Sequence, residues 1–177
     1  MTFTQHYRSP LGEILLAADE SGLKGLWFEG QKYVAQNLPC ENLEQQTSVL
    51  EKTKQWLDIY FKGKEPDFTP PLNPVGSDFR LAVWDVLLRI PYGKTTTYGD
   101  IAKKLSDERK FSKMSAQAVG NAVGHNSISI IIPCHRVVGA SGSLTGYAGG
   151  IDRKIELLKL EGADMSGLFV PKKGTAL

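Results

Sequence analysis

The first 75 residues combine short apolar runs with turn residues, followed by one stretch of helical spacing. Residues 12–18 and 25–28 are rich in apolar side chains and flank a polar turn at residues 19–22, so they are predicted to form two strands. From Val49 to Phe61 the apolar side chains recur at intervals of three and four, which predicts an amphipathic helix. No catalytic group of residues is visible in this part of the chain.

A proline-rich segment follows at residues 65–74. Four of its ten residues are proline. Proline has no backbone N–H to donate, so this segment is excluded from a helix interior and from a central strand. We interpret it as the connector between two domains, residues 1–75 and residues 76–177.

After the connector, the apolar positions predict three helices. The first is expected to start at Ser77 or Asp78. The second opens at Thr97, which is placed to cap it. The third runs from about Ser115 to Val123, after a polar loop. Two short helices joined by a turn form a helix-turn-helix pattern, which on its own only suggests DNA binding.

The third helix is unusual because its outer face carries no charge. Its inner face is expected to consist of Val119, Ala122 and Val123. Opposite them lie residues that are small or carry an amide, namely Gln117, Gly120, Asn121 and Gly124. Two glycines cost about 2 kcal/mol of helix propensity relative to alanine. Close approach of the helix backbone to another surface would explain them, and packing against a neighbouring helix is the alternative.

Charge is distributed unevenly between the two halves. Residues 1–75 carry 7 Lys and Arg against 10 Asp and Glu, whereas residues 76–177 carry 14 against 9. The positive surplus therefore lies in the second half, where it suits contact with a phosphate backbone. A surplus of this size alone predicts only weak, salt-sensitive affinity.

Length and composition exclude several classes of protein. A chain of 177 residues is one large domain or two small ones. No apolar stretch approaches the roughly 20 residues of a membrane span, and the first residues lack the features of a signal peptide. We therefore expect a cytoplasmic protein. The three histidines and two cysteines show no metal-ligand spacing, so no metal or other cofactor is expected.

Cys134 is the leading candidate for chemistry. It follows the apolar run at residues 128–133, which is predicted to be a buried strand ended by its proline. His135 and Arg136 come directly after it, and such groups stabilise a thiolate. A buried, inert cysteine is the alternative. A lone disulfide with Cys40 is a weaker idea than a reducing compartment.

The sequence around Cys134 resembles the O6-alkylguanine-DNA alkyltransferases, also called methylated-DNA–protein-cysteine methyltransferases. The matching pieces are Asn126, residues 130–138, residues 146–150 and residues 154–162, and residues 79–124 match in order and spacing. The likeness is good over residues 76–165 and loose over the first 75. It implies an α+β fold, in which a small ribonuclease-H-like sheet domain precedes a mainly helical, winged helix-turn-helix-like domain.

The resemblance implies DNA repair by irreversible transfer of an alkyl group from O6 of guanine to Cys134, once per molecule and without a cofactor. Activity on O4-alkylthymine is left open. In such a site Glu161 polarises His135, which draws the thiol proton through a water molecule, while Asn126 braces the turn. Independently, a carboxylate at the C-terminal end of a helix over residues 151–160 is disfavoured by the helix dipole, so Glu161 needs a compensating partner.

The resemblance also implies a pocket for the extruded base and a helix that enters the minor groove of duplex DNA. The pocket residues are Tyr98, the backbone of Val137, Tyr147, Ala148 and Gly149, and the helix carries Gly120 and Asn121. Gln117 stands where the family usually has an arginine that fills the space left by the base. Arg109, Lys110 and Lys113 in the preceding loop are candidates for phosphate contacts, with a solvated charge cluster as the alternative. The expected partner is duplex DNA containing alkylated guanine, bound by a monomer.

Two other classes of function remain open. One is a cysteine hydrolase built on Cys134 and a histidine, which would need an oxyanion hole and repeated turnover. The other is a lesion-binding module without catalysis, although relatives of that kind carry tryptophan in place of the cysteine.

Overall fold

The computed structural model describes residues 1–36, 38–108 and 114–172, and it separates into two compact units. The first unit comprises Met1–Val75 and Ser127–Ile131, and the second comprises Gly76–Asn126 and Ile132–Leu177. The chain therefore enters the second unit after residue 75, returns to the first for five residues, and re-enters the second just before Cys134. The α+β class expected from the resemblance is confirmed.

The first unit is a four-stranded sheet with one helix. Its elements are β1 (Thr2–Ser9), β2 (Gly12–Ala18), β3 (Leu23–Phe28), β4 (Asn42–Glu44) and α1 (Ser48–Tyr60). The strand order is β3-β2-β1-β4, with β4 parallel to β1 and the other pairs antiparallel. The two predicted strands and the helix are confirmed. The inner strand β1 escapes sequence analysis because two of its buried positions carry Thr2 and Thr4 instead of apolar side chains.

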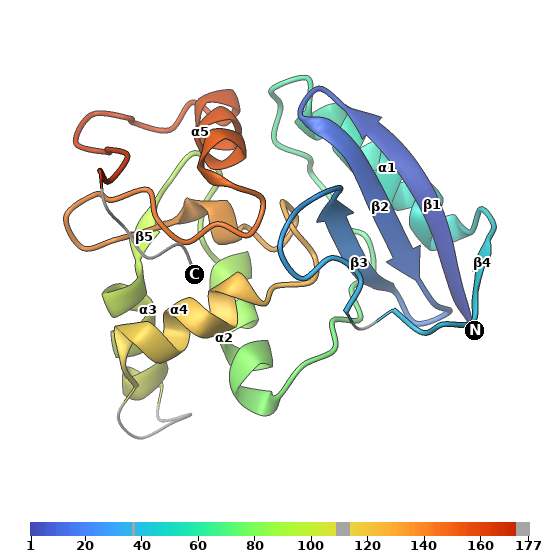
Figure 1. Ribbon diagram of the computed structural model, residues 1–177, viewed down its shortest axis with the longest axis horizontal. Helices are drawn as coiled ribbons and strands as arrows, with labels where there is room; N and C mark the ends of the chain where they lie inside the picture. Colours follow the sequence, from blue (N-terminus) through green and yellow to red (C-terminus); the bar gives the residue numbers. More distant parts are fainter. Residues whose placement is uncertain (37, 109–113, 173–177) are drawn as a thin grey trace. The chain divides into compact units, whose positions relative to one another are not determined.

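Helix α1 lies along one face of this sheet (Figure 1). Its side chains Leu50, Leu57 and Tyr60 are fully buried, as are Leu16 and Leu26 of the sheet. The hydroxyl of its N-cap residue accepts a hydrogen bond from the first turn. These apolar side chains form the core of the first unit.

The segment before Cys134 is not the buried strand that its composition predicts. Only Ile128 forms a bridge, to Leu26 of β3, and residues 129–131 are a turn. The N–H of Ile131 donates to the Ser129 carbonyl at 2.8 Å, and Ile130 has φ +68°. Because this N–H donates within the turn, it cannot donate to β3 as it would in a strand. Burial rather than strand geometry accounts for the apolar composition here.

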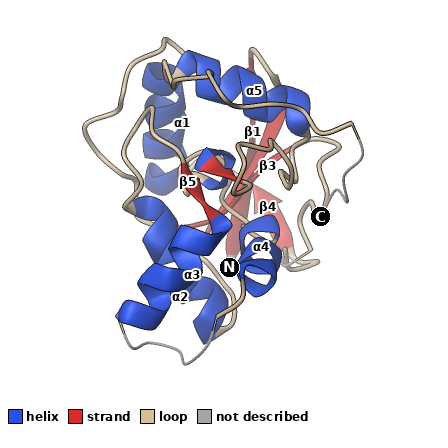
Figure 2. Cartoon of the chain, turned by 90° about the vertical axis from the view of Figure 1, so that its left-hand side faces the viewer, coloured by secondary structure: helices blue, strands red, loops and turns tan. Residues whose placement is uncertain are grey.

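The second unit is mainly helical. Its elements are α2 (Asp78–Leu88), β5 (Thr96–Thr97), α3 (Tyr98–Asp107), α4 (Ala116–Gly124), the 3-10 helix η1 (Cys134–Arg136), β6 (Val137–Val138) and α5 (Ile151–Leu160). Helices α2, α3 and α4 pack together (Figure 2). Strand β5 pairs with β6 in parallel. The side chains of Ser77, Thr97 and Ser115 each accept a hydrogen bond from the first turn of the following helix. The helices and caps predicted for this half are confirmed.

Helix α4 packs more broadly than its sequence suggests. Val119, Ala122 and Val123 are buried as expected, but Gly120 and Gly124 are buried too, and the expectation that they belong to the outer face was wrong. The helix packs against both α2 and α3, so its buried arc is wider than a single apolar stripe. The Trp84 indole N–H of α2 donates to the Ala122 carbonyl at 2.8 Å. Packing of α4 against its neighbouring helices therefore accounts for the buried glycines.

Candidate active site

Cys134 is buried, with 4 % of its surface exposed, and is the first residue of η1. Before it, Pro133 has φ −81° and ψ 63°, and the N–H of Cys134 donates to the Ile132 carbonyl at 2.8 Å. These are the features of an inverse γ-turn. The thiol is thus presented where a turn enters a 3-10 helix, not where a strand ends.

The side chain of Asn126 contacts the sulfur directly. Its Nδ2 donates to the Ile132 carbonyl at 2.9 Å and to Cys134 Sγ at 3.2 Å. Burial raises the pKa of the Cys134 thiol, and the Asn126 hydrogen bond, the charge of Lys154 and nearby backbone N–H groups oppose that rise. Because these donors favour the charged form, they act in the direction that a nucleophilic thiol requires.

His135 and Glu161 form a buried pair in which His135 Nε2 lies 2.6 Å from Glu161 Oε1. Burial alone would raise the pKa of Glu161, but hydrogen bonds and charges from His135 and Arg136 outweigh it and lower that pKa to about 2. An ionised carboxylate only accepts, so Nε2 carries the proton. Burial also lowers the pKa of His135, so the ring is neutral near pH 7 and its Nδ1 is an unprotonated acceptor.

His135 Nδ1 is buried and has no hydrogen-bond partner among the described residues. A neutral imidazole with its other nitrogen fixed by a carboxylate is the arrangement of a general base. The free nitrogen is the atom that can take a proton.

Arg136 is the second partner of Glu161. Its Nε donates to Glu161 Oε2 at 2.8 Å, its Nη2 to Oε1 at 3.0 Å, and its Nη1 to the Ile90 carbonyl at 2.7 Å. Its guanidinium also lies 5.7 Å from the ring centre of Tyr92. The Arg136 guanidinium neutralises the buried Glu161 carboxylate, which would destabilise the fold without such a partner. Glu161 is therefore held ionised beside a histidine that stays neutral.

Lys154 is a fully buried cation on α5. Its Nζ donates to the carbonyls of Val137 and Thr145, and the latter also accepts the Tyr98 hydroxyl at 3.1 Å. Burial lowers the pKa of Lys154 to about 8, and negative charge at Cys134 opposes that fall. Lys154 thus joins β6 to the loop that carries Thr145, and Tyr98 is held on the same carbonyl.

Tyr147 and Gly149 form another part of the site. The Tyr147 ring lies edge-on to His135, with 6.4 Å between ring centres. A Cβ added to Gly149 would lie 2.6 Å from that tyrosine ring, so any larger residue there would displace the ring. Ala148 between them is partly exposed.

The structure brings some of the predicted site residues together and leaves others apart. Hydrogen bonds, a ring contact and an electrostatic interaction connect the residues Cys134, Asn126, His135, Glu161 and Tyr147 and, through Lys154, Val137 and Tyr98. Gln117 and Asn121 are exposed on α4, whereas Gly120 is buried there. Arg109, Lys110 and Lys113 lie outside the described residues.

Sequence analysis assigned no role to Lys154 and took Arg136 as a group that stabilises the thiolate, whereas the structure pairs Arg136 with Glu161. A signal existed for Lys154, because it shares the apolar face of α5 with Leu157 and Leu158 at helical spacing. A lysine on an apolar helix face either extends to solvent or is a buried cation with specific hydrogen-bond partners. For Arg136 the signal is weaker, because its partner Glu161 is 25 residues away in sequence.

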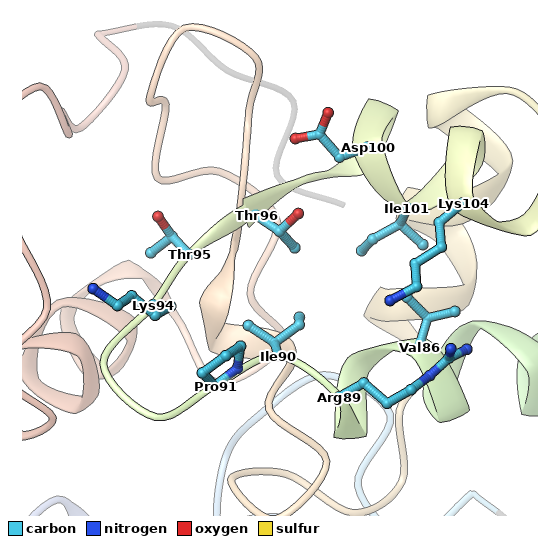
Figure 3. Close-up of a pocket in the computed structure, with 10 residues that line it drawn as sticks. All are labelled: Val86, Arg89, Ile90, Pro91, Lys94, Thr95, Thr96, Asp100, Ile101 and Lys104. Carbon is cyan, nitrogen blue, oxygen red and sulfur yellow. The ribbon is translucent and has the colours of Figure 1, made fainter.

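A separate pocket of about 280 Å³ lies in the second unit (Figure 3). Val86, Ile90 and Ile101 form apolar parts of its wall, and Lys94 and Lys104 contribute amines. None of the reactive residues lines it. Within the described ranges, no cluster of three or more His, Cys, Asp or Glu side chains is placed to hold a metal ion. No helix in that same part of the chain is long and apolar enough to cross a membrane.

The sequence matches two family models that together span most of the chain. Residues 3–74 match the ribonuclease-like domain of 6-O-methylguanine DNA methyltransferase, and residues 78–163 match its DNA-binding domain. The chain is 46% identical over 158 residues to a methylated-DNA–protein-cysteine methyltransferase of Methanosarcina acetivorans, covering 89% of this chain and 96% of the relative. It is 43% identical over 159 residues to that of Mycobacterium tuberculosis, covering 88% and 92%.

Solved structures from Mycobacterium tuberculosis are similar as well. One is the O6-methylguanine methyltransferase, with a TM-score of 0.77 and 39% identity over 98% of this chain and 97% of that one. Another is OGT in complex with DNA, with a TM-score of 0.77 and 40% identity over 90% and 92%. Both the fold and the order of the elements are therefore shared over nearly the whole chain.

Proposed function

The chain belongs to the 6-O-methylguanine DNA methyltransferase family, and we propose on that basis that it repairs DNA by moving an alkyl group from O6 of guanine to its own Cys134. One observation carries the assignment to this residue. Asn126 donates to Cys134 Sγ, and the adjacent His135 is kept neutral by burial while Glu161 holds its Nε2. A thiol with a donor on its sulfur and a base beside it is equipped for nucleophilic attack.

Activation begins with removal of the thiol proton. His135 Nδ1 is the acceptor, and a bridging water carries the proton from Cys134 to it. Glu161 stabilises the imidazolium that forms, as a carboxylate does in related dyads. The Asn126 amide and the Lys154 ammonium favour the thiolate that remains.

The thiolate then attacks the alkyl carbon in line with the bond to O6. A sulfur–carbon bond forms, the carbon–oxygen bond breaks, and its electron pair leaves on the guanine. The guanine gains a proton at N1, which balances the thiol proton that His135 took up. The Tyr98 hydroxyl exchanges its hydrogen bond to the Thr145 carbonyl for one to the departing base. Burial, followed by the charge at Cys134, raises the pKa of this hydroxyl and keeps it protonated. The thioether has no route back to a thiol, so each molecule acts once. No cofactor enters, because the damaged base is the alkyl donor.

Duplex DNA is the proposed partner, bound by a monomer through the helix pair α3 and α4. A relative from Mycobacterium tuberculosis that shares this fold was crystallised in complex with DNA. Exposed Gln117 and Asn121 give α4 a polar, uncharged edge, and residues 76–177 carry the positive surplus. A cytoplasmic location is part of the proposal, because the substrate is cellular DNA and both thiols are free.

The fate of a labelled methyl group separates this function from its two rivals. Protein mixed with duplex carrying labelled O6-methylguanine should acquire the label, and the amount should stop rising at one methyl per molecule. A hydrolase would release label as methanol beyond that amount, and a binding module would leave it on the DNA. Either result would refute the proposed transfer.

Replacing Gln117 with arginine should accelerate repair of the lesion in duplex DNA. An arginine there adds charge and a planar group that can stack in the space left by the extruded base. Free O6-benzylguanine needs no extrusion, so its reaction should change little. Gln117→Ala should slow the duplex reaction only modestly, because one hydrogen bond contributes about 0.5–1.5 kcal/mol. Single-turnover rates on both substrates provide the measurement.

The exposed Gln55 of α1 offers a matched control, because Gln55→Arg adds the same charge to the other unit. It should leave both rates at the parental value. Equal acceleration of the duplex and free-base reactions by Gln117→Arg would mean that position 117 does not act on the extruded base. So would a Gln117→Ala variant that matches the parent on duplex.

A further inference from the structure

The backbone is strained four residues before Cys134. Ile130 has φ +68°, and around it the N–H of Ile131 donates to the Ser129 carbonyl at 2.8 Å. A bond between residues two apart around a positive φ is the rare, strained form of the γ-turn. Of the three non-glycine residues with positive φ in the described part of the chain, Ile130 alone is β-branched. Side chains of that kind almost never adopt this conformation.

Contacts on the sheet side of the turn hold it in place. The Leu26 N–H donates to the Ser127 carbonyl at 2.8 Å, and the Ser129 N–H donates to the Leu26 carbonyl at 3.0 Å. The Ser129 hydroxyl donates to Gln31 Oε1 at 3.4 Å, and that oxygen also accepts from Phe28 N–H. A strained residue persists only where its surroundings over-determine it. Both residues that flank Ile128 are therefore fixed on β3 before the turn begins.

The residues after the turn lead to the thiol. The Ile132 carbonyl accepts from Asn126 Nδ2 at 2.9 Å and from the Cys134 N–H at 2.8 Å. The same Asn126 amide donates to Cys134 Sγ at 3.2 Å. One carbonyl therefore sets both the position of the Asn126 amide and the start of η1.

We propose that the turn at Ile130 is a positioning device for Cys134. It fixes the direction in which the chain leaves Ser129, and so places the Ile132 carbonyl where Asn126 holds the sulfur. Ile130 acts through the backbone, as a positioning residue. The proposal rests on the proposed function for the role of Cys134 as alkyl acceptor.

The choice of isoleucine follows from the same reasoning. A glycine would adopt a positive φ without strain, but it would also populate many other conformations. A β-branched residue has few alternatives once its neighbours force it into the turn. The strain is the cost of a single, well-defined chain direction.

The test compares Ile130→Val, Ile130→Ala and Ile130→Gly with the parent. Valine keeps the β-branch, alanine keeps the Cβ, and glycine removes the constraint. Each protein is assayed by thermal unfolding, by single-turnover transfer from free O6-benzylguanine, and by the rate of Cys134 alkylation with iodoacetamide. Peptide mass analysis separates Cys134 from the exposed Cys40.

Stability and reactivity should change in opposite directions between two of the variants. Ile130→Gly should unfold at a higher temperature than Ile130→Ala, because glycine relieves the positive φ. It should nevertheless react about tenfold more slowly in both assays, because small misplacements of a reacting group are costly. Ile130→Val should fold and retain the parental rates within about twofold.

Ile128, fully buried in the same segment without a positive φ, is the matched control. At position 128, Ile128→Ala should be more stable than Ile128→Gly. An Ile130→Gly protein that is less stable than Ile130→Ala, or that reacts as fast, would overturn the proposal. So would an Ile130→Val protein as slow as Ile130→Gly, because packing would then be the cause.

Failure of the proposed function would look different. The parent would then react with iodoacetamide at Cys134 but not with the benzylated guanine. The iodoacetamide rates of the variants would still decide whether the turn positions the thiol.

Discussion

Replacing His135 with alanine should slow alkyl transfer by about tenfold or more, because loss of the base leaves the buried thiol largely protonated. Each pKa unit at the thiol corresponds to about 1.4 kcal/mol. The substitution leaves no buried charge unpaired, because Glu161 remains paired with Arg136. Single-turnover transfer from methylated duplex, set beside the affinity for the same duplex, measures the effect.

DNA affinity should remain close to that of the parent, since His135 is fully buried. His6→Ala is a suitable control, because that histidine lies on β1 and its side chain is 48% exposed. It should change neither quantity. Equal losses of affinity and transfer in His135→Ala would mean that the residue is merely structural.

The pH dependence of transfer follows from the same pair. Burial lowers the pKa of His135, so the ring stays a neutral base to a pH below its ordinary value of 6.5. The rate in the parent should therefore hold through neutral pH and fall only in more acidic solution. In His135→Ala this acidic limb should be lost, because the group that titrates is gone.

Glu161→Gln is a less selective change than His135→Ala. It would slow transfer, but it would also leave the Arg136 guanidinium buried without its carboxylate, which destabilises a protein by about 3–5 kcal/mol. The pKa of Glu161 is lowered from 4.5 to about 2, so its contribution to stability is present above pH 4.5 and is lost as the pH falls toward 2. The stability difference between parent and variant, measured by urea unfolding, should shrink over that window.

The helices could be predicted from the sequence because local signals and packing agree there. Ser77, Thr97 and Ser115 cap helices where the apolar spacing begins, and the structure uses all three as caps. Strand β1 was missed because threonines fill two of its buried positions. Its pairing with β2 and β4 comes from tertiary contact that local pattern does not encode.

The segment at residues 128–132 shows where composition misleads. A run of isoleucines is compatible with a buried strand and with a buried turn. The contacts of this segment with Leu26 and Asn126 show that it is a turn. Of the site residues that the family resemblance implies, Asn126 contacts the Cys134 sulfur and Glu161 contacts His135. The pairing of Arg136 with Glu161 and of Lys154 with Val137 could not be predicted, because these partners lie 25 and 17 residues away in sequence.

Mass analysis of the protein after reaction with excess O6-methylguanine duplex tests the central claim most directly. The intact protein should gain the mass of a single methylene group, and peptide mapping should locate it on Cys134. Cys134→Ser should gain nothing, while Cys40→Ser, which changes the exposed thiol, should match the parent. Methylation at any other residue, or repair of more than one lesion per protein molecule, would contradict single transfer to Cys134.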